Sequence, residues 1–179
     1  MVAEILELLR YCWIMTIGIE RLLRHMAWAN QKAIEHMETM PEEALKSFAT
    51  NSEWFASEIL HHIVDSADAY AYRITGEHPI GEGIKITEIE KISDLALFKE
   101  QARVVDAALL ESAKLDDVQL EFTNYSGNLV KRWRSTILSQ SIHHATEHRA
   151  QFAAALEAKG FAPLDLDEID LWSYEIAHS

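Results

Sequence analysis

The stretch Ser-Ile-His-His-Ala-Thr-Glu-His-Arg-Ala-Gln, residues 141–151, holds three histidines within an expected helix. Its His144 and His148 are four positions apart, so their Cβ atoms share one helix face at roughly 5–6 Å from each other. Both imidazoles can therefore reach one metal ion. A second pair of histidines lies far away, in Leu60-His61-His62-Ile63. We expect a helical bundle that brings one histidine of this second pair to His144 and His148.

The length and composition describe one globular unit. The chain has 179 residues, which suits one domain, or one domain with an appended segment. Hydrophobic residues make up 49% of the chain and charged residues 25%, which are ordinary proportions for a globular protein. A core of this size folds without a disulfide or a metal. Any metal would therefore serve function rather than hold the fold together.

The charge balance excludes several kinds of partner. The chain has 16 basic and 29 acidic residues, a net charge of −13. Because phosphate neutralisation dominates nucleic-acid affinity, we expect no nucleic-acid partner, and no docking on anionic lipid. No stretch approaches the ~18 uninterrupted apolar residues of a membrane span, so no membrane partner is expected either. Cys12 is the single cysteine, which allows no disulfide within the chain and predicts a reducing, cytoplasmic location.

The first residues form a separate unit. The segment from Met1 to Ile17 is fairly apolar, but charged residues at positions 4, 7 and 10 interrupt it. No small-residue cleavage site follows, so the segment does not have the pattern of a signal peptide. Met15 is a second plausible start. We therefore predict an N-terminal extension with helical character, residues 1–14, and a domain of residues 15–179.

Apolar residues at spacings of three and four predict four long helices. These helices span residues 19–40, 52–75, 93–114 and 135–160. Proline or glycine marks three of the ends: Pro41 follows the first helix, Gly76 the second and Gly160 the fourth. Asn51 or Ser52 is expected to cap the second helix. Residues 77–87 read as a loop, and the acidic, aromatic tail from residue 161 is expected to pack across the helices.

Residues 117–133 follow a different period. Val118, Leu120 and Phe122 alternate with polar residues, which is typical of a strand. The sequence Asn-Tyr-Ser-Gly-Asn at 124–128 supplies turn chemistry before a return strand at 129–133. This pattern predicts a small β-hairpin between the third and fourth helices. The predicted fold class is therefore all-α, an antiparallel four-helix bundle with one hairpin.

Three histidines fall in the apolar stripes that should face the bundle interior. They are His62 on the second helix and His144 and His148 on the fourth. Neutral imidazole is a common ligand of zinc and similar ions, and three protein ligands with an open position are the usual catalytic arrangement. A buried histidine without a partner costs free energy, which a cation would remove. We therefore predict His62, His144 and His148 as the metal ligands.

Other interpretations of the histidines stay open. His61 lies about 100° around the helix from His62, so His61 and His143 are expected to be non-ligands. The position of His25 in the sequence does not indicate that it is a metal ligand. Histidines on an apolar face are often satisfied by hydrogen bonds, which would make the bundle purely structural. Glu58 and His61 form a Glu-x-x-His motif of the di-iron type, but the second motif and two further glutamates are missing.

No motif assigns a catalytic side chain. The chain has no phosphate-binding Gly-x-x-x-x-Gly-Lys-Ser/Thr loop, no Gly-x-Gly-x-x-Gly and no Gly-x-Ser-x-Gly. The metalloprotease motif His-Glu-x-x-His is not met, because Ala145 follows His144. Glu147 is expected to turn outward rather than to act as a general base. The catalytic residues therefore remain unassigned.

Four segments of the chain match a known pattern: Met26-Ala27-Trp28-Ala29-Asn30, Met40-Pro41-Glu42-Glu43, Leu60-His61-His62-Ile63 with Tyr70, and His144-Ala145-Thr146-Glu147-His148-Arg149-Ala150-Gln151. In these segments the chain resembles the DinB-like family of damage-inducible helical metalloproteins. The resemblance runs from about residue 19 to the tail, and Ala150 replaces the glycine of the family's His-x-x-x-His-Arg-Gly-Gln motif. The resemblance implies a DinB-like four-helix bundle, often a homodimer, with a three-histidine site for a divalent ion. Carried over position by position, the implied ligands are His62, His144 and His148.

The activity that the resemblance implies is broad. Some family members look like transferases or isomerases that use a low-molecular-weight thiol. We expect a divalent-metal protein that acts on a small molecule, as a metal-dependent thiol transferase, isomerase or hydrolase. The alternative is a non-catalytic metal-binding or stress-responsive bundle protein. Three imidazoles suit zinc, nickel, copper or iron, of which we expect zinc or nickel, with iron as the alternative. No set of residues indicates a particular substrate.

Overall fold

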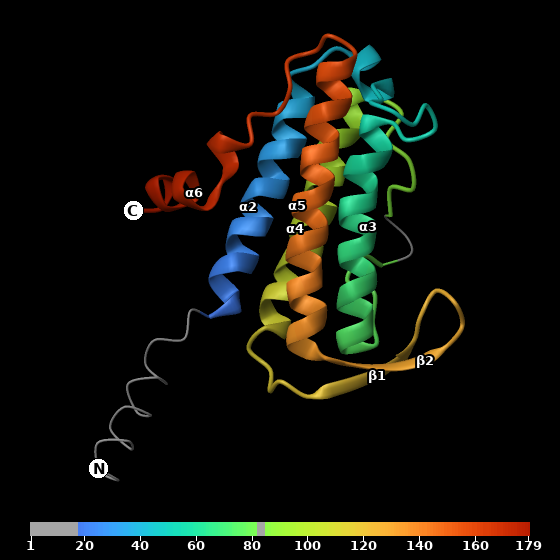
Figure 1. Cartoon of the computed structure of the whole chain (residues 1–179), viewed down its shortest axis with the longest axis vertical. Coiled ribbons are helices and arrows are strands. Elements are labelled where there is room, and N and C mark those ends of the chain that lie inside the picture. Colours follow the sequence, from blue (N-terminus) through green and yellow to red (C-terminus); the bar gives the residue numbers. More distant parts are fainter. Residues whose placement is uncertain (1–17, 82–84) are drawn as a thin grey trace.

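Four long helices lie side by side in the computed structural model, which describes residues 18–81 and 85–179 (Figure 1). The predicted extension, residues 1–14, lies outside the described residues. α2 and α3 each pack against both α4 and α5, so the four helices surround one core. The helices are α2 (Ile19–Glu38), α3 (Ala56–Thr75), α4 (Leu95–Ser112) and α5 (Arg134–Ala158). The prediction of a mostly helical chain is confirmed.

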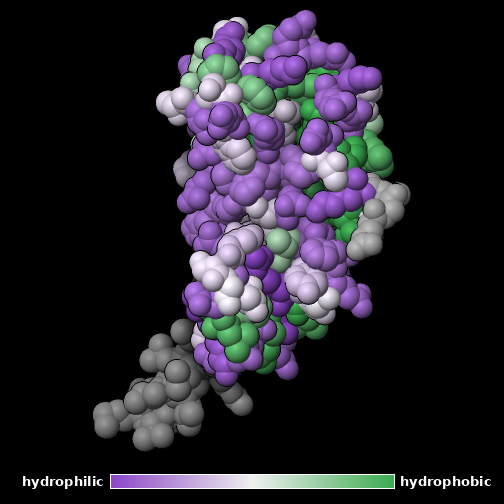
Figure 2. All heavy atoms as spheres, turned by 90° about the vertical axis from the view of Figure 1, so that its right-hand side faces the viewer, coloured by the Kyte–Doolittle hydropathy of each residue, from purple (hydrophilic) through white to green (hydrophobic). Residues whose placement is uncertain are grey.

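The core draws apolar side chains from all four helices. Leu23 and Met26 of α2, Phe98 of α4 and Phe152 of α5 are at most 1% exposed. Truncating a buried phenylalanine to alanine typically costs about 3–5 kcal/mol, so either ring alone is worth a large part of a domain's net stability. On the outside, hydrophilic side chains cover most of the face shown in Figure 2. Within the described residues, no helix combines the length and apolarity needed to cross a membrane.

The start of α3 differs from the prediction. The side chain of Asn51 accepts a hydrogen bond from the backbone N–H of Glu53 at 3.0 Å, which makes a turn rather than a helix cap. The carboxylate of Glu58 accepts the N–H of Phe55 at 2.7 Å, and the helix begins at Ala56. The prediction of a start at Ser52 was therefore wrong by about one turn. A short 3-10 helix, Glu42–Lys46, precedes this region.

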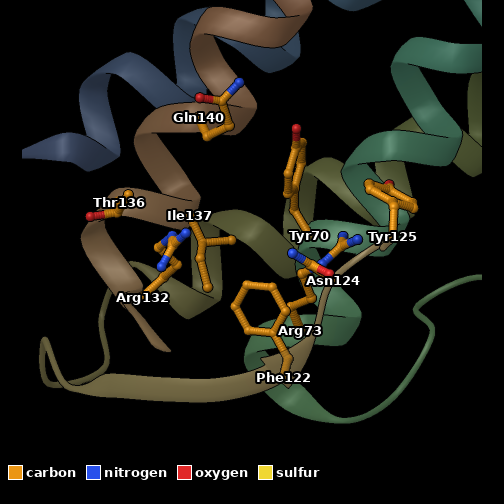
Figure 3. A pocket seen from close by; sticks show the side chains of 9 residues that line it. All are labelled: Tyr70, Arg73, Phe122, Asn124, Tyr125, Arg132, Thr136, Ile137 and Gln140. Carbon is orange, nitrogen blue, oxygen red and sulfur yellow. The ribbon is translucent and has the colours of Figure 1, made fainter. Parts of the chain in front are cut away.

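The predicted hairpin is present. β1 (Gln119–Thr123) pairs antiparallel with β2 (Leu129–Trp133), so that Phe122 lies opposite Val130. The side chain of Asn124 accepts backbone N–H groups from Ser126 and Asn128, and Gly127 has a φ of +78° that few other residues adopt. The hairpin crosses the ends of α3 and α5, and side chains from all three surround one space (Figure 3).

The tail lies along α2. It contains a 3-10 turn, Asp167–Ile169, and the short helix α6 (Leu171–Ala177). The ring nitrogen Nε2 of His25 hydrogen-bonds to the carbonyl of Ile169 at 2.8 Å, and Arg21 forms an ion pair with Glu175 at 2.7 Å. These contacts attach α6 to the outer face of α2, on the side away from α3 (Figure 1).

Candidate metal centre

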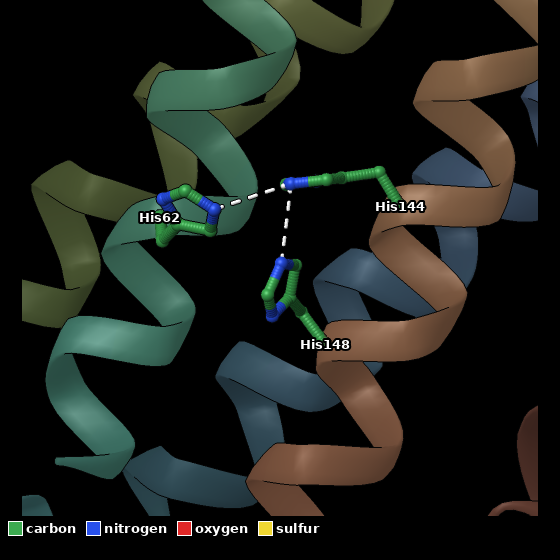
Figure 4. Close-up of side chains that lie close together, drawn as sticks. All are labelled: His62, His144 and His148. Atoms are coloured by element: carbon green, nitrogen blue, oxygen red, sulfur yellow. Dashed lines mark hydrogen bonds between the residues drawn. The ribbon is translucent and has the colours of Figure 1, made fainter. Parts of the chain in front are cut away.

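Three imidazoles from two helices converge at one point (Figure 4). α3 supplies His62, and α5 supplies His144 and His148. The Nε2 atom of His144 lies 3.1 Å from that of His62 and 3.1 Å from that of His148. All three ligand atoms lie within 4.8 Å of one another, and they form the group among the described residues that could hold a metal ion. The structure thus brings the three predicted residues together.

The other histidines point elsewhere. His61 hydrogen-bonds to the carbonyl of Ile86 at 3.0 Å and stacks on Phe98, whereas His143 is exposed. His25 is engaged with the tail. Helical phase explains this separation, because adjacent positions on a helix project about 100° apart. The expectation that His61 and His143 stay outside the group therefore agrees with the geometry.

The group lies at the edge of the core rather than at its centre. His62, His144 and His148 are partly buried, while Leu60, Ile63, Ala67 and Ala71 of α3 are buried. The prediction that the histidine stripe faces the bundle interior was therefore wrong by part of a turn. The reason is that α3 packs against both α4 and α5. Its most buried side chains therefore point between these two helices, and His62 lies to one side of them, next to α5.

The surroundings keep two of the three imidazoles, those of His144 and His62, uncharged. Burial, followed by the positive charges that His148 and His62 carry when protonated, lowers the pKa of His144 to about 4. Burial is also the main cause that lowers the pKa of His62, followed by His148. Both rings are therefore neutral near pH 7 and present lone pairs, as a metal ligand must.

The spacing of the nitrogens fits a transition metal. Zinc–nitrogen bonds of 2.0–2.1 Å in a tetrahedral site place two ligand nitrogens about 3.3–3.4 Å apart. Two of the three edges of the histidine triangle measure 3.1 Å. In the part of the chain that the structure describes, no carboxylate or thiolate joins the three nitrogens. Three nitrogen donors leave at least one position of a tetrahedral ion for water or a substrate.

Two further side chains orient the group. The Nδ1–H of His148 donates to Oε1 of Gln151 at 2.8 Å, which leaves Nε2 of the same ring free to bind an ion. The indole N–H of Trp54 donates to the same oxygen at 3.3 Å. The Trp54 ring lies 5.3 Å from the ring of His62 and 6.0 Å from that of His148, edge to face. Trp54 therefore forms one wall of the site.

A groove reaches the group from the side of α3. It has a volume of about 790 Å³. Its lining includes His62, Trp54, Glu58 and Asp65, together with residues 87–91 of the loop before α4. A molecule in this groove can approach His62 from the solvent.

A comparison with protein families identifies the family of this chain. The model of the DinB family matches residues 15–176. The chain belongs to the DinB family. The predicted resemblance is thereby confirmed over most of the chain. The comparisons with curated proteins and with solved structures find no match.

This DinB-family chain also contains a buried polar network that the sequence reading missed. Arg149, next to His148, is 3% exposed, and its Nη1 donates to Oδ1 of Asn30 at 2.6 Å. The amide of Asn30 donates in turn to Asp106 at 3.4 Å. Burial raises the pKa of Asp106 to about 7 and lowers that of Arg149 to about 10. The available signal was helical phase, since Arg149 follows the buried Ala145 by four positions.

Proposed function

We propose that this DinB-family protein binds one divalent ion through His62, His144 and His148 and uses it to act on a small molecule. The observation that carries the proposal is the convergence of three Nε2 atoms with two separations of 3.1 Å. The Nε2 atom of His148 carries no proton, because its Nδ1–H donates to Gln151, so a single Nε2–H on His144 would have to serve both neighbouring Nε2 atoms. A cation accepts all three lone pairs at once. Zinc or nickel fits this donor set best, with iron as the alternative.

The chain's own residues prepare the site. Gln151 holds His148 in the tautomer that leaves Nε2 free, and the low pKa of His144 keeps that ring deprotonated. Trp54 and the groove beside His62 define where a small molecule enters. A divalent ion bound there supplies Lewis-acid activation of a thiol or of water. We infer a metal-dependent thiol transferase or isomerase that uses a low-molecular-weight thiol, or a hydrolase that uses water.

The setting of this activity is part of the same proposal. We propose that α2–α5 form an antiparallel four-helix bundle, that the domain comprises residues 15–179 with residues 1–14 as an extension, and that two copies form a homodimer. The pairwise packing of the four helices supports the bundle. The net charge of −13 supports small-molecule partners rather than nucleic acids or anionic membranes, and the single cysteine supports a reducing, cytoplasmic compartment.

A non-catalytic, stress-responsive metal-binding protein is the alternative. The observation in its favour is Trp54, whose ring contacts both His62 and His148 and narrows the approach to the ion site. In this alternative the site holds the ion without presenting it to a substrate. The two functions share the same three ligands and differ in turnover.

Elemental analysis of the purified protein after supplementation with zinc or nickel tests the metal site. We expect about one ion per chain in the wild type and in His143→Ala, which removes an exposed imidazole next to His144 in the sequence, because one set of three nitrogens binds one ion. His148→Ala should lose the ion. Full occupancy in His148→Ala would show that the ligand set is wrong. A wild type that takes up neither metal would overturn the metal function altogether.

The rate at which cysteine displaces chloride from an activated aryl chloride tests catalysis. The sulfur–carbon bond forms as chloride leaves, and the thiol proton passes to the buffer. We expect the metal-loaded wild type and His143→Ala to accelerate this reaction above the metal-free protein. Equal rates with and without metal, together with full metal occupancy, would favour the non-catalytic alternative.

A further inference from the structure

A second cavity lies at the hairpin end of the helical core (Figure 3), and it shares no lining residue with the groove described above. Its volume is about 230 Å³. A cavity of roughly 150 Å³ is enough to hold a benzene ring, so this one admits a small aromatic or branched aliphatic molecule. Side chains from α3, α5 and the hairpin line it: Tyr70, Arg73, Phe122, Asn124, Tyr125, Arg132, Thr136, Ile137 and Gln140.

The cavity contains two arginines and no acidic residue. Elsewhere acidic side chains are abundant, since the chain has 29 of them against 16 basic ones. Nevertheless, among the described residues no carboxylate lies within ion-pair distance of Arg73 or Arg132, whereas Arg21, Arg24 and Arg103 all have such partners. The local charge of the cavity is therefore opposite to that of the protein as a whole.

Arg73 is held in place by aromatic rings. Its guanidinium carbon lies 5.7 Å from the ring centre of Tyr70, 5.5 Å from that of Phe122 and 5.0 Å from that of Tyr125. Its Nη1 atom is buried and has no hydrogen-bond partner in the described part of the chain. A buried donor without a partner is unfavourable, the more so when it is charged. Arg73 lines the cavity, so an acceptor there, toward which the guanidinium turns, would supply the missing partner.

Arg132 adds a second, more accessible cation. It lies on β2 opposite Leu120 and is exposed, and its Nη1 donates to the carbonyl of Lys131 at 2.7 Å. A guanidinium has five N–H donors, so several remain for a ligand. Figure 3 shows the two arginines on either side of Phe122, with Ile137 between Arg132 and the centre of the cavity. Two cations thus flank an apolar floor.

The cavity borders the histidine group through Tyr70. The Tyr70 ring lies 5.8 Å from the ring of His144, edge to face. Gln140 lies one helical turn before His144 on α5, a rise of about 5–6 Å. A molecule bound in the cavity therefore lies within about two helical turns of the candidate metal centre.

We propose that this cavity binds a small carboxylic acid, with Arg73 and Arg132 holding the carboxylate and Phe122, Tyr70 and Ile137 holding the apolar body. Guanidinium forks match a carboxylate in shape and charge, and their hydrogen bonds are charge-assisted. The further step, that such an acid is the substrate of the metal centre, rests on the proposed function. The binding of the acid does not depend on it.

Benzoate is a suitable probe, and benzamide is its neutral counterpart of the same size. Both are titrated into metal-free wild-type protein and followed by the NMR chemical shifts of its amides, so that benzoate cannot report coordination to an ion. We expect benzoate to shift the amides around Tyr70, Phe122 and Tyr125, and benzamide to bind at least about tenfold more weakly, since a charge-assisted hydrogen bond is worth about 1.5–3 kcal/mol. Raising the salt concentration should weaken benzoate more than benzamide.

Substitutions locate the anion site. Arg73→Gln and Arg132→Gln should each raise the dissociation constant of benzoate about tenfold, which is the loss of one charge-assisted contact. Arg103→Gln removes the same charge from an exposed position on α4 and should leave binding unchanged. If Arg73→Gln fails to fold, Arg132→Gln and Arg73→Lys decide the matter, because lysine keeps the charge but lacks the fork and should bind benzoate more weakly.

Three results would overturn the inference: no benzoate binding by folded wild type, equal affinity for benzoate and benzamide, or equal losses in Arg73→Gln and Arg103→Gln. None of them bears on the metal site, which elemental analysis tests separately. Conversely, a protein that binds benzoate but takes up no zinc or nickel would retain this inference and lose the proposed function.

Discussion

Gln151 accepts a hydrogen bond from Nδ1 of His148 at 2.8 Å, one turn further along α5. The amide oxygen can only accept, so the proton lies on Nδ1 and the lone pair lies on Nε2, on the side where the three histidines meet. The same oxygen accepts the indole N–H of Trp54 at 3.3 Å. One exposed side chain thus fixes the ring orientation of one candidate ligand and the position of the wall beside it.

Gln151→Leu should therefore weaken metal binding without removing a ligand. Loss of such an outer partner typically costs about 10–100-fold in metal affinity, because the ring is no longer held in its binding tautomer. Competition with a chromogenic chelator measures the affinity for zinc. Glu147→Gln, an exposed change on the same helix, serves as the control. Equal affinities in the two variants would show that Gln151 does not orient His148.

The metal-free protein should lose stability in mild acid. The pKa of His144 is about 4 in the folded chain against an ordinary value of 6.5, and burial is the main cause. Between these two values the unfolded chain binds a proton that the folded chain does not, so the free energy of unfolding falls as the pH falls from 6.5 to 4. His62 contributes in the same direction.

Urea unfolding midpoints measured from pH 4 to pH 8 follow this loss. His144→Gln, which cannot be protonated, should show a shallower fall than the wild type over the same range. Added zinc should hold the wild type stable to lower pH, because a bound ion competes with the proton for the same lone pair. Identical pH profiles for wild type and His144→Gln in the absence of metal would contradict the assignment.

Asn30→Ala should destabilise the fold through Arg149. The substitution removes the acceptor of a 2.6 Å hydrogen bond from a guanidinium that is 3% exposed. A hydrogen bond to a charged group is worth about 1.5–3 kcal/mol, and the charge left behind is buried. Thermal and urea unfolding measure the loss. The control Asn128→Ala, in the exposed hairpin turn, should have a free energy of unfolding within about 0.5 kcal/mol of wild type. An equally small loss in Asn30→Ala would show that the network does not stabilise the fold.

Asp106→Asn should change how stability depends on pH near neutrality. Burial raises the pKa of Asp106 from 3.8 to about 7, although Asn30 and Arg149 act against that shift. The folded chain therefore holds a proton between these values that the unfolded chain has released, and the wild type becomes less stable as the pH rises towards 7. The amide of the variant is never charged. The free energy of unfolding of the variant, relative to that of the wild type, should therefore be higher at pH 8 than at pH 5. An equal difference at both pH values would mean that Asp106 is ionised throughout.

Local patterns predicted much of this structure. The hairpin was foreseen because both of its signals are local: the alternation around Phe122 and the turn residues Asn124 and Gly127 act within a few positions. The choice of His62 over His61 was equally local, because helical phase alone separates their directions. The convergence of His62 with His144 required only that α3 and α5 be neighbours.

Features that depend on distant partners were missed. Arg149 looks like a surface residue until Asn30, 119 positions away, and Asp106 are placed around it. The start predicted for α3 was too early. Asn51 and Glu58 each accept a backbone N–H near this end of the helix, and the sequence pattern does not show which of the two marks the helix start. The arginine cavity escaped notice because Arg73 and Arg132 become neighbours only when the hairpin folds over α3.

His62 and His144 are 82 positions apart in the chain, and this separation has a consequence for biosynthesis. A growing polypeptide exposes α3 to its surroundings while α5 is still untranslated. A fragment that stops before position 144 carries one of the three imidazoles and competes poorly with free chelators in its compartment. An ion that requires all three is therefore acquired by the finished chain, so metal limitation would leave a pool of complete but unloaded protein rather than of interrupted products.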